Sequence, residues 1–503
     1  MPFNSFAYLL VFLPFMVLLY FFLTRLKLVL AARVCLILGS LFFYSWGQPV
    51  YLLVILGSTG LNYFIGNAII KKNASGINTR TLVVIGIALD LVVLGYFKYT
   101  AFFVENLNAV MGSNFIIPKI VLPLALSFYT FQQISFLVDS HRGQVKMKGF
   151  LEYCQFVCFF PQLISGPIVR FNKIMPQHNS LRGKIFNYQN ISTGILLIAV
   201  GLFKKTILAD SLAVWADNGF DKLDSLNAIT AWVTSLSYTF QVYFDFSSCI
   251  DIALGSACLF NIKLPVNFDS PYKALSIKDF WRRWHITLSE WLRDYLFLPI
   301  AYFTMNRIHQ PKLLKIKAEF WGYSIAALGT MLLAGIWHGA GWNFLLWGGL
   351  HGAALIVYRV WTKTRIKLPT ALAWFLTFNF INLTWIFFRA NSFKDAFKVI
   401  EGMFSFHNVS IKEFLNFISV PRGFLADYGI KFYSLAFAPG NNFRAVLLIL
   451  ISFFIVLLLK NSNYLFSAKI SPVKTALWTS VFIFISLMSL FLEVPSQFIY
   501  FRF

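Results

Sequence analysis

The sequence predicts an all-α, polytopic helical membrane protein. Of its 503 residues, 58% are hydrophobic and 13% are charged, whereas soluble domains carry roughly 25% charged residues. Apolar runs recur from one end of the chain to the other, and helices satisfy their own backbone hydrogen bonds within lipid. We therefore expect one membrane domain over residues 1–503 without a fused soluble domain. It should have about 11–13 membrane-embedded helices, at roughly 20 residues for each span.

The charge balance is strongly basic, with a formal net charge of +23 from 43 Lys and Arg against 20 Asp and Glu. In a soluble protein this excess would indicate nucleic-acid binding. Here the basic residues fall in short clusters between apolar runs, as orientation signals of membrane spans do. We therefore expect the lipid bilayer as a partner and no nucleic acid.

The basic clusters also predict how the chain is threaded. The first apolar run, Phe6–Leu23, precedes the cluster Arg25–Arg33 and lacks the cleavage pattern of a signal peptide. The N-terminus is therefore expected outside, with this cluster in the cytoplasm. The same rule makes 390–442 an extracytoplasmic loop and 493–503 an extracytoplasmic C-terminal tail. Further helices are expected at 32–46, 50–70, 81–97, 117–138, 190–208, 228–244, 246–262, 370–388, 443–459 and 475–492.

Two stretches carry prolines that should interrupt a helix. Pro118 and Pro123 should break the helix near Val121. Residues 151–169, LEYCQFVCFFPQLISGPIV, contain two more breaks. A short, broken apolar segment fits a re-entrant or cavity-lining element better than a clean span.

Residues 320–361 are expected to form a hairpin that holds two histidines, His338 and His351, in an apolar run. An ionisable group at membrane depth usually faces an internal cavity or pathway. Glycines surround His338, and Trp337, Trp342 and Asn343 beside it are candidates for lining a ligand slot. The alternative is a histidine satisfied within a helix-packing seam, because small residues also let membrane helices approach closely. Basic flanks on both sides place the turn away from the cytoplasm.

Residues 279–300, DFWRRWHITLSEWLRDYLFLPI, are expected to be helical. His285 would then share a face with Arg282 and Ser289. Arg282 and Arg283 can bind the phosphates of an anionic cofactor, because guanidinium binds phosphate oxygens bidentately. They can equally be orientation signals, and Glu290 can pair with Arg293 or Asp294 can sit near it.

The chain ends in Phe498–Phe503, FIYFRF. Such an aromatic cluster is typical of an interfacial anchor. The chemical alternative is that Tyr500 folds back and presents its hydroxyl to the cavity. A phenol needs a base to take its proton before its oxygen can react, and a neutral imidazole is the natural proton acceptor.

Several long stretches in the same order resemble the membrane-bound O-acyltransferases, in their bacterial polysaccharide-acetylation branch. They are VLPLALSFYTFQQISFLVD (121–139), FFPQLISGPI (159–168), DFWRRWHITLSEWLRDYLFLPI (279–300), WHGAGWNFLLWGGLHG (337–352) and the terminal FIYFRF. The resemblance implies a fold around a central tunnel, with the acyl donor entering from the cytoplasm. The near-invariant family histidine falls on His338, the second motif histidine on His285, and a tyrosine proposed as an acyl carrier on Tyr500.

The resemblance further implies an acyl-CoA-dependent O-acetyltransferase in the bacterial cytoplasmic (inner) membrane. Acetyl-CoA would be the donor, and an extracytoplasmic glycan, peptidoglycan or exopolysaccharide, the final acceptor. Such proteins typically act with a separate extracytoplasmic transferase of the hydrolase (SGNH-type) fold. A proton-coupled transporter or glycan flippase that uses His338, His285 and Asp90 is the alternative, and a structural scaffold is a third class.

Other catalytic patterns do not appear in the chain. The soluble acyltransferase pattern HxxxxD is not matched, since Glu290 stands at that spacing from His285. The sequence also contains neither a GxSxG elbow nor a P-loop. Its five cysteines form no CxxC pair and have no supporting histidine spacing, so we expect neither a metal site nor a disulfide.

Overall fold

The computed structural model describes residues 1–503 except 309–311, 314–315, 406–441, 468–470, 493–497 and 500–503. The described helices are α1 (Leu13–Arg25), α2 (Val29–Ser45), α3 (Tyr51–Ala74), α4 (Arg80–Met111), α5 (Leu126–His141), α6 (Phe150–Cys158), α7 (Phe160–Leu163), α8 (Phe171–Asn179), α9 (Tyr188–Phe203), α10 (Asp210–Asp221), α11 (Ala228–Leu259), α12 (Ile277–Arg283), α13 (Ile286–Leu292), α14 (Leu298–Arg307), α15 (Ala318–His338), α16 (Trp342–Thr364), α17 (Thr370–Arg389), α18 (Phe393–Phe404), α21 (Asn442–Leu458), α22 (Tyr464–Ser467) and α23 (Pro472–Leu492). Short π-helical segments are Ala7–Phe12, Lys204–Ala209 and Arg293–Phe297, and 3₁₀ turns are Arg182–Lys184, Leu223–Ser225 and Pro271–Lys273. Two strands of two residues each, β1 (Lys312–Leu313) and β2 (Ile316–Lys317), pair in antiparallel fashion before α15.

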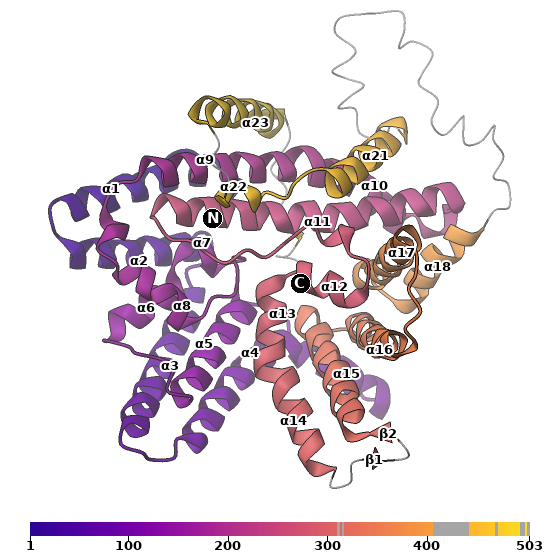
Figure 1. The fold of residues 1–503 in the computed structure, drawn as a ribbon, viewed down its shortest axis with the longest axis horizontal. Coiled ribbons are helices and arrows are strands. Elements are labelled where there is room, and N and C mark those ends of the chain that lie inside the picture. The colour runs from indigo at the N-terminus through magenta and orange to yellow at the C-terminus, as the bar shows by residue number, and fades with distance from the viewer. Residues whose placement is uncertain (309–311, 314–315, 406–441, 468–470, 493–497, 500–503) are drawn as a thin grey trace, which may run out of the picture.

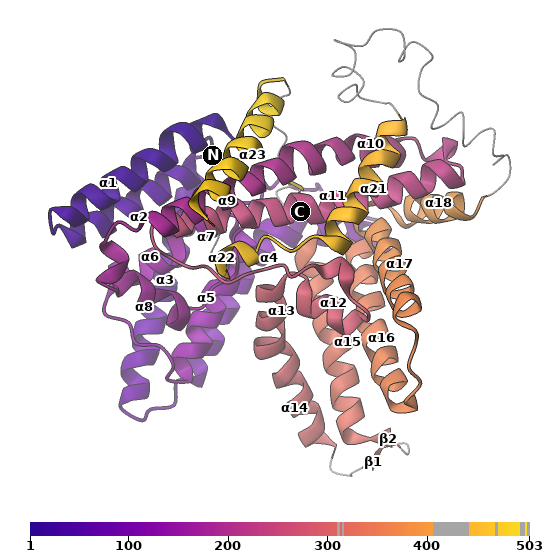
Figure 2. The same ribbon diagram turned by 45° about the horizontal axis from the view of Figure 1, so that its top comes forward.

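The predicted polytopic helical class is confirmed. Within the described ranges, nine helices are long and apolar enough to cross a membrane. Two shorter apolar helices, α2 and α21, accompany them. In Figures 1 and 2, α9 and α11 lie side by side across the molecule. The helices α3, α4 and α5 extend from them as one group, and α14, α15 and α16 as another.

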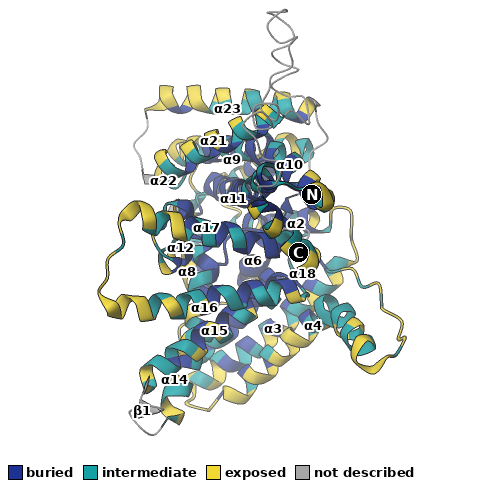
Figure 3. Cartoon of the chain, turned by 90° about the vertical axis from the view of Figure 1, so that its right-hand side faces the viewer, coloured by how far each residue is buried: buried dark blue, intermediate teal, exposed yellow. Residues whose placement is uncertain are grey.

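Helix α11 is the centre of the fold. It begins at a capping box in which Asn227 and Thr230 bond each other's backbone N–H groups. Its most apolar 18-residue window is 100% buried, so other helices rather than lipid surround it, as its dark colour in Figure 3 shows. The expectation of two spans at 228–244 and 246–262 is therefore wrong. Asp245 interrupts the apolar pattern, but inside the protein it pairs with Lys205, and the helix continues through it.

Proline interrupts the chain where the sequence predicts it. The segment with Pro118 and Pro123 is not helical, and α5 begins only at Leu126. Residues 151–169 are broken into α6 and α7, which meet at Phe159, whose backbone is not helical. Beyond α17, the predicted loop 390–442 contains α18, and its residues 406–441 lie outside the described part of the chain.

The predicted hairpin is confirmed, with α15 ending at His338 and α16 beginning at Trp342. The two helices cross closely because glycines face carbonyl groups of the other helix. A Cβ atom on Gly335 would meet the carbonyl oxygen of Phe344, and one on Gly348 would meet that of Met331. This crossing fixes the position of His338 at the end of α15.

We expect Gly348→Val to destabilise the protein by about 1–3 kcal/mol, the usual cost of overpacking. The added side chain would press on backbone of α15, which cannot rotate away. The thermal midpoint of the purified protein, followed by size-exclusion chromatography after heating, measures the effect. Gly329→Val is the matched control, because open space surrounds Gly329 on the same hairpin. Equal midpoints for both variants would contradict the close crossing.

Candidate active site

His338 is buried in an aromatic cage at the end of α15. His338 is only 6% exposed. The centre of its imidazole lies 4.8 Å from that of Trp337, 5.2 Å from that of Trp347 and 5.3 Å from that of Phe388. Rings from α15, α16 and α17 therefore hold the imidazole from three directions.

A small cavity borders His338. Its walls come from α11, α17, the segment between α12 and α13, and the C-terminal segment. The lining residues are Val242, Asp245, Phe246, Trp284, His338, Trp385, Phe388 and Ile499. The volume open to the centre of a water molecule is about 10 Å³, enough for about one water. The cavity is thus a narrow, mostly aromatic slot with one carboxylate in its wall.

His285 also lies at this aromatic cluster, but not on the predicted helix face. The helix expected over 279–300 stops at Arg283 and restarts at Ile286. His285 sits in the break with φ +43°, a backbone conformation that side chains rarely adopt. It therefore does not share a helix face with Arg282 and Ser289. Such strain often accompanies functional sites.

The two predicted histidines come together on one indole. The centre of the His285 ring lies 6.4 Å from that of Trp337 and 4.9 Å from that of Phe246. His338 packs on the same Trp337. The structure thus brings both candidate catalytic residues, which lie 53 positions apart in the sequence, to Trp337; His338 lines the cavity, and His285 packs on Phe246, which also lines it.

The third histidine, His351, is fixed by hydrogen bonds. Trp281 donates its Nε1–H to His351 Nδ1 at 3.2 Å, and His351 Nε2 lies 3.2 Å from Thr384 Oγ1. Because an indole can only donate, Nδ1 is the acceptor, and the neutral ring carries its hydrogen on Nε2. Thr384 donates its own hydrogen to Ile381 O. His351 is therefore a structural residue that joins α12, α16 and α17.

The three residues expected to line a slot beside His338 have different environments. Trp337 is buried, and its carbonyl oxygen accepts a hydrogen bond from Lys98. Trp342 is 55% exposed and donates to Asn106 at 2.9 Å. Asn343 donates to the Ala390 carbonyl at 2.7 Å. Of the three, only Trp337 packs on His338, and none of them is among the residues that line the cavity.

Arg282 and Arg283 share one carboxylate. Arg282 Nη2 lies 2.5 Å and Arg283 Nε 3.0 Å from oxygens of Asp279. Partial burial raises the pKa of Asp279, but the hydrogen bonds and charges of the two arginines together outweigh it, so the pKa lies below its usual value. Of the two carboxylates expected near Arg293, Asp294 contacts it at 2.7 Å, whereas Glu290 lies 3.8 Å from Lys173.

The end of the chain reaches the His338 cavity. Phe498 is fully buried, and Ile499 is 9% exposed and lines the cavity. The Ile499 N–H donates to Asp245 Oδ2 at 2.8 Å, while Lys205 lies 4.8 Å from the centre of the Phe498 ring. Tyr500, the residue after Ile499, lies outside the described residues.

Lys205 and Asp245 are the site residues that the sequence analysis missed. Lys205 Nζ contacts Asp245 at 2.7 Å and Asp210 at 2.9 Å, and the Lys205 and Asp245 side chains are almost completely buried. The sequence did contain a signal for this pair, because Lys205 and Asp245 are charged residues within apolar stretches. Charges in such positions are buried only when they are paired. Among the described residues, no group of three or more His, Cys, Asp or Glu side chains is placed to hold a metal ion.

Comparison with known proteins gives the family. The model of the membrane-bound O-acyltransferase family matches residues 139–394. The peptidoglycan O-acetyltransferase of Helicobacter pylori is 41% identical, covering 100% of this chain and 97% of its own length. The probable alginate O-acetylase of Pseudomonas aeruginosa is 36% identical over 82% of this chain and 76% of its own length. The teichoic acid D-alanyltransferase of Bacillus subtilis is 27% identical over 54% of this chain and 69% of its own length. The chain therefore belongs to the membrane-bound O-acyltransferase family, and it is an O-acyltransferase of the membrane.

Proposed function

We propose that this protein takes an acetyl group from cytoplasmic acetyl-CoA and passes it across the membrane for O-acetylation of peptidoglycan. The observation that carries the proposal is the position of Ile499 in the His338 cavity. It brings a segment that continues directly into Tyr500 to the buried imidazole. The full-length similarity to a peptidoglycan O-acetyltransferase favours peptidoglycan over an exopolysaccharide, because the alginate relatives match less of the chain.

The proposed chemistry uses His338 as the base. His338 takes the phenolic proton of Tyr500 while that oxygen forms a bond to the thioester carbonyl carbon. The carbon–sulfur bond then breaks, and the proton passes from the imidazole to the departing thiolate of coenzyme A. His285, which also lies beside Trp337, orients the thioester or stabilises the negative charge that develops on the thioester carbonyl oxygen. An acetyl ester on Tyr500 would be the product of this half-reaction.

The rest of the pathway is proposed from the sequence. The basic clusters support a multi-pass protein of the bacterial inner membrane with both termini on the extracytoplasmic side. An extracytoplasmic transferase of the SGNH-type hydrolase fold would take the acetyl group from Tyr500 to the glycan. Membership in an acyltransferase family favours this function over a proton-coupled transporter or flippase that uses the same histidines.

A reconstitution experiment tests the proposal directly. Purified protein in liposomes, with a secreted hydrolase-fold partner present, should release free coenzyme A from acetyl-CoA and add O-acetyl groups to peptidoglycan. Mass spectrometry of the glycan measures the product. Release of coenzyme A without acetylated glycan would contradict the assigned acceptor, and no release at all would contradict acetyl-CoA as donor.

The Lys205–Asp245 pair is proposed to hold the C-terminal segment in the cavity. We expect Asp245→Asn to lower O-acetylation at least about tenfold, because breaking a buried pair costs about 3–5 kcal/mol and 1.4 kcal/mol is a factor of ten. In an Ile499→Cys background, Asp245→Asn should also make the thiol introduced at position 499 accessible to a water-soluble maleimide. Both the acetylation level and the labelling rate are measured.

A neighbouring ion pair supplies the matched control for this prediction. Lys204 contacts Asp251 at 2.7 Å, and Asp251 also accepts from Ser462 at 2.8 Å. Asp251→Asn breaks a pair on the same two elements, with side chains 12% and 4% exposed against 1% and 2% for Lys205 and Asp245, without touching the C-terminal segment. It should leave the labelling of Cys at position 499 unchanged. Equal labelling in both variants would contradict the proposed anchoring role.

A further inference from the structure

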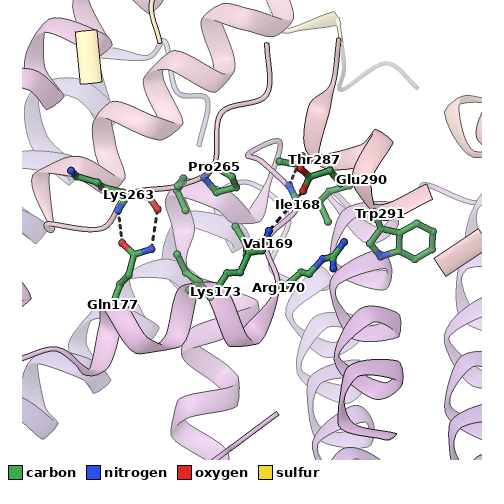
Figure 4. Close-up of a pocket in the computed structure, with 12 residues that line it drawn as sticks. Ile168, Val169, Arg170, Lys173, Gln177, Lys263, Pro265, Thr287, Glu290 and Trp291 are labelled. Atoms are coloured by element: carbon green, nitrogen blue, oxygen red, sulfur yellow. Dashed lines mark hydrogen bonds and ion pairs between the residues drawn. The ribbon is translucent and has the colours of Figure 1, made fainter. Parts of the chain in front are cut away.

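A second pocket lies between α8, the segment after α11, and α13 (Figure 4). It has an accessible volume of about 200 Å³, much larger than the slot at His338. Its lining includes three basic residues, Arg170, Lys173 and Lys263, and one acidic residue, Glu290. The pocket therefore has an excess of positive charge in its wall.

The surrounding carboxylates leave this charge incompletely balanced. Arg170 contacts Asp294 at 2.5 Å, but Asp294 is shared with Arg293 at 2.7 Å. Lys173 and Glu290 are 3.8 Å apart, and their side chains are 65% and 43% exposed, so this ion pair is weak.

Lys263 is held at the rim by its backbone rather than by its charge. Its N–H donates to Gln177 at 2.9 Å, and its carbonyl accepts from Gln177 at 3.1 Å, as the dashed lines in Figure 4 show. The residue is exposed, and its ammonium is therefore accessible to an anion in solvent.

Stacked rings connect the pocket wall to the candidate active site. Trp291 lines the pocket and stacks on Phe131 with ring centres 4.0 Å apart. Phe131 stacks on Trp337 at 5.0 Å, and Trp337 packs on His338 at 4.8 Å. These three steps place the Trp291 ring within about 14 Å of the His338 ring, roughly half the ~30 Å thickness of a hydrocarbon core.

The pocket lies at the end of the molecule that carries the predicted cytoplasmic clusters. Arg33, from the first of these clusters, donates to Asn179 in α8 at 2.6 Å. At the far end of α4, by contrast, Lys98 and Asn106 contact the turn that holds His338. The basic pocket and the His338 turn therefore approach the membrane interior from different ends.

We propose that this pocket binds the phosphate groups of the acyl donor. This assignment rests on the proposed use of acetyl-CoA. Lysine and arginine bind phosphate oxygens through charge-assisted hydrogen bonds. The pocket holds phosphates rather than a whole coenzyme, so the adenosine stays outside and the pantetheine arm extends beside Trp291 towards His338. Arg282 and Arg283, which share Asp279, are then not the main phosphate ligands.

Kinetics with two donors test the site. Lys173→Ala/Lys263→Ala should raise the KM for acetyl-CoA about tenfold with kcat unchanged, because exposed charge contacts contribute up to about threefold to fivefold each. The KM for S-acetylpantetheine, which lacks phosphate, should stay the same. Glu290→Gln should act in the opposite direction and lower the KM for acetyl-CoA.

The control removes two exposed lysines from the same face of the membrane. Lys71→Ala/Lys72→Ala, at the end of α3, should leave the KM for acetyl-CoA near its original value. Raised salt should weaken acetyl-CoA use by the parent protein more than by the Lys173/Lys263 variant. An equal rise in KM for both double variants, or for both donors, would overturn the proposal.

A binding measurement separates this proposal from the proposed function. Adenosine 3′,5′-bisphosphate should bind the parent protein in phosphatidylcholine nanodiscs and bind the Lys173/Lys263 variant about tenfold more weakly. This result supports a phosphate site even if acetyl-CoA is never turned over. If the nucleotide does not bind, while anionic phospholipid vesicles bind the parent protein better than the variant, the phosphate belongs to lipid and the donor assignment is overturned.

Discussion

Replacing His338 by alanine is expected to reduce glycan O-acetylation at least about a hundredfold, because a positioned base contributes about 10²–10⁴-fold. The imidazole is held by rings from three helices and borders the cavity that Ile499 enters. The amount of protein in the membrane should stay close to that of the parent. Mass spectrometry of glycan O-acetyl groups and an immunoblot of membranes measure the two quantities.

His351 offers the matched control for this substitution. It is a second buried histidine of the same hairpin, but its two nitrogens are used by Trp281 and Thr384. His351→Ala should therefore lower the amount or the thermal stability of the protein more than the activity of each remaining molecule. Normal O-acetylation by the His338→Ala protein would remove the catalytic assignment of His338 and leave His338 as a packing residue.

Replacing Tyr500 by phenylalanine is expected to abolish O-acetylation while keeping the aromatic tail. The substitution removes one oxygen and no ring, so any anchoring by aromatic contacts survives. Ile499 and Phe498 should remain in place, because their contacts with Asp245 and Lys205 do not involve the phenol. The loss would then belong to the hydroxyl group alone.

The acetyl ester itself is the sharpest readout for Tyr500. Incubation of the parent protein with acetyl-CoA, without the partner, should yield a C-terminal peptide that is heavier by one acetyl group. The peptide from Tyr500→Phe and that from His338→Ala should both lack it. Full activity of Tyr500→Phe would show that the tail serves only as an anchor.

Much of the fold was predictable because apolar runs and prolines act locally. The hairpin turn after His338, the break before Leu126 and the broken segment at Phe159 follow from residues at those positions. The two errors have non-local causes. Asp245 does not end a helix, because Lys205 from another segment neutralises it. His285 does not continue one, because Asn267, from another segment, accepts hydrogen bonds from the backbone N–H groups of Ile286 and Thr287, and His285 turns to φ +43°.

The candidate site was predictable only in part, for a similar reason. His338 and Trp337 stand out as polar or aromatic residues in a glycine-rich apolar run, and they remain neighbours in space. The anchor for the C-terminal segment depends on Asp245 meeting Ile499 from the other half of the chain. The basic pocket likewise needs Lys263 and Lys173 to meet from separate segments. No spacing in the sequence records such contacts.

The complete burial of the most apolar window of α11 affects how its sequence can vary over evolution. A lipid-facing position accepts nearly any apolar side chain, since acyl tails adapt to its shape. The most apolar window of α23 is only 17% buried, so most of its positions have that freedom, whereas α11 has none in its own window. Neutral drift should therefore accumulate in α23, while changes in α11 should arise together with compensating changes in the helices that touch it.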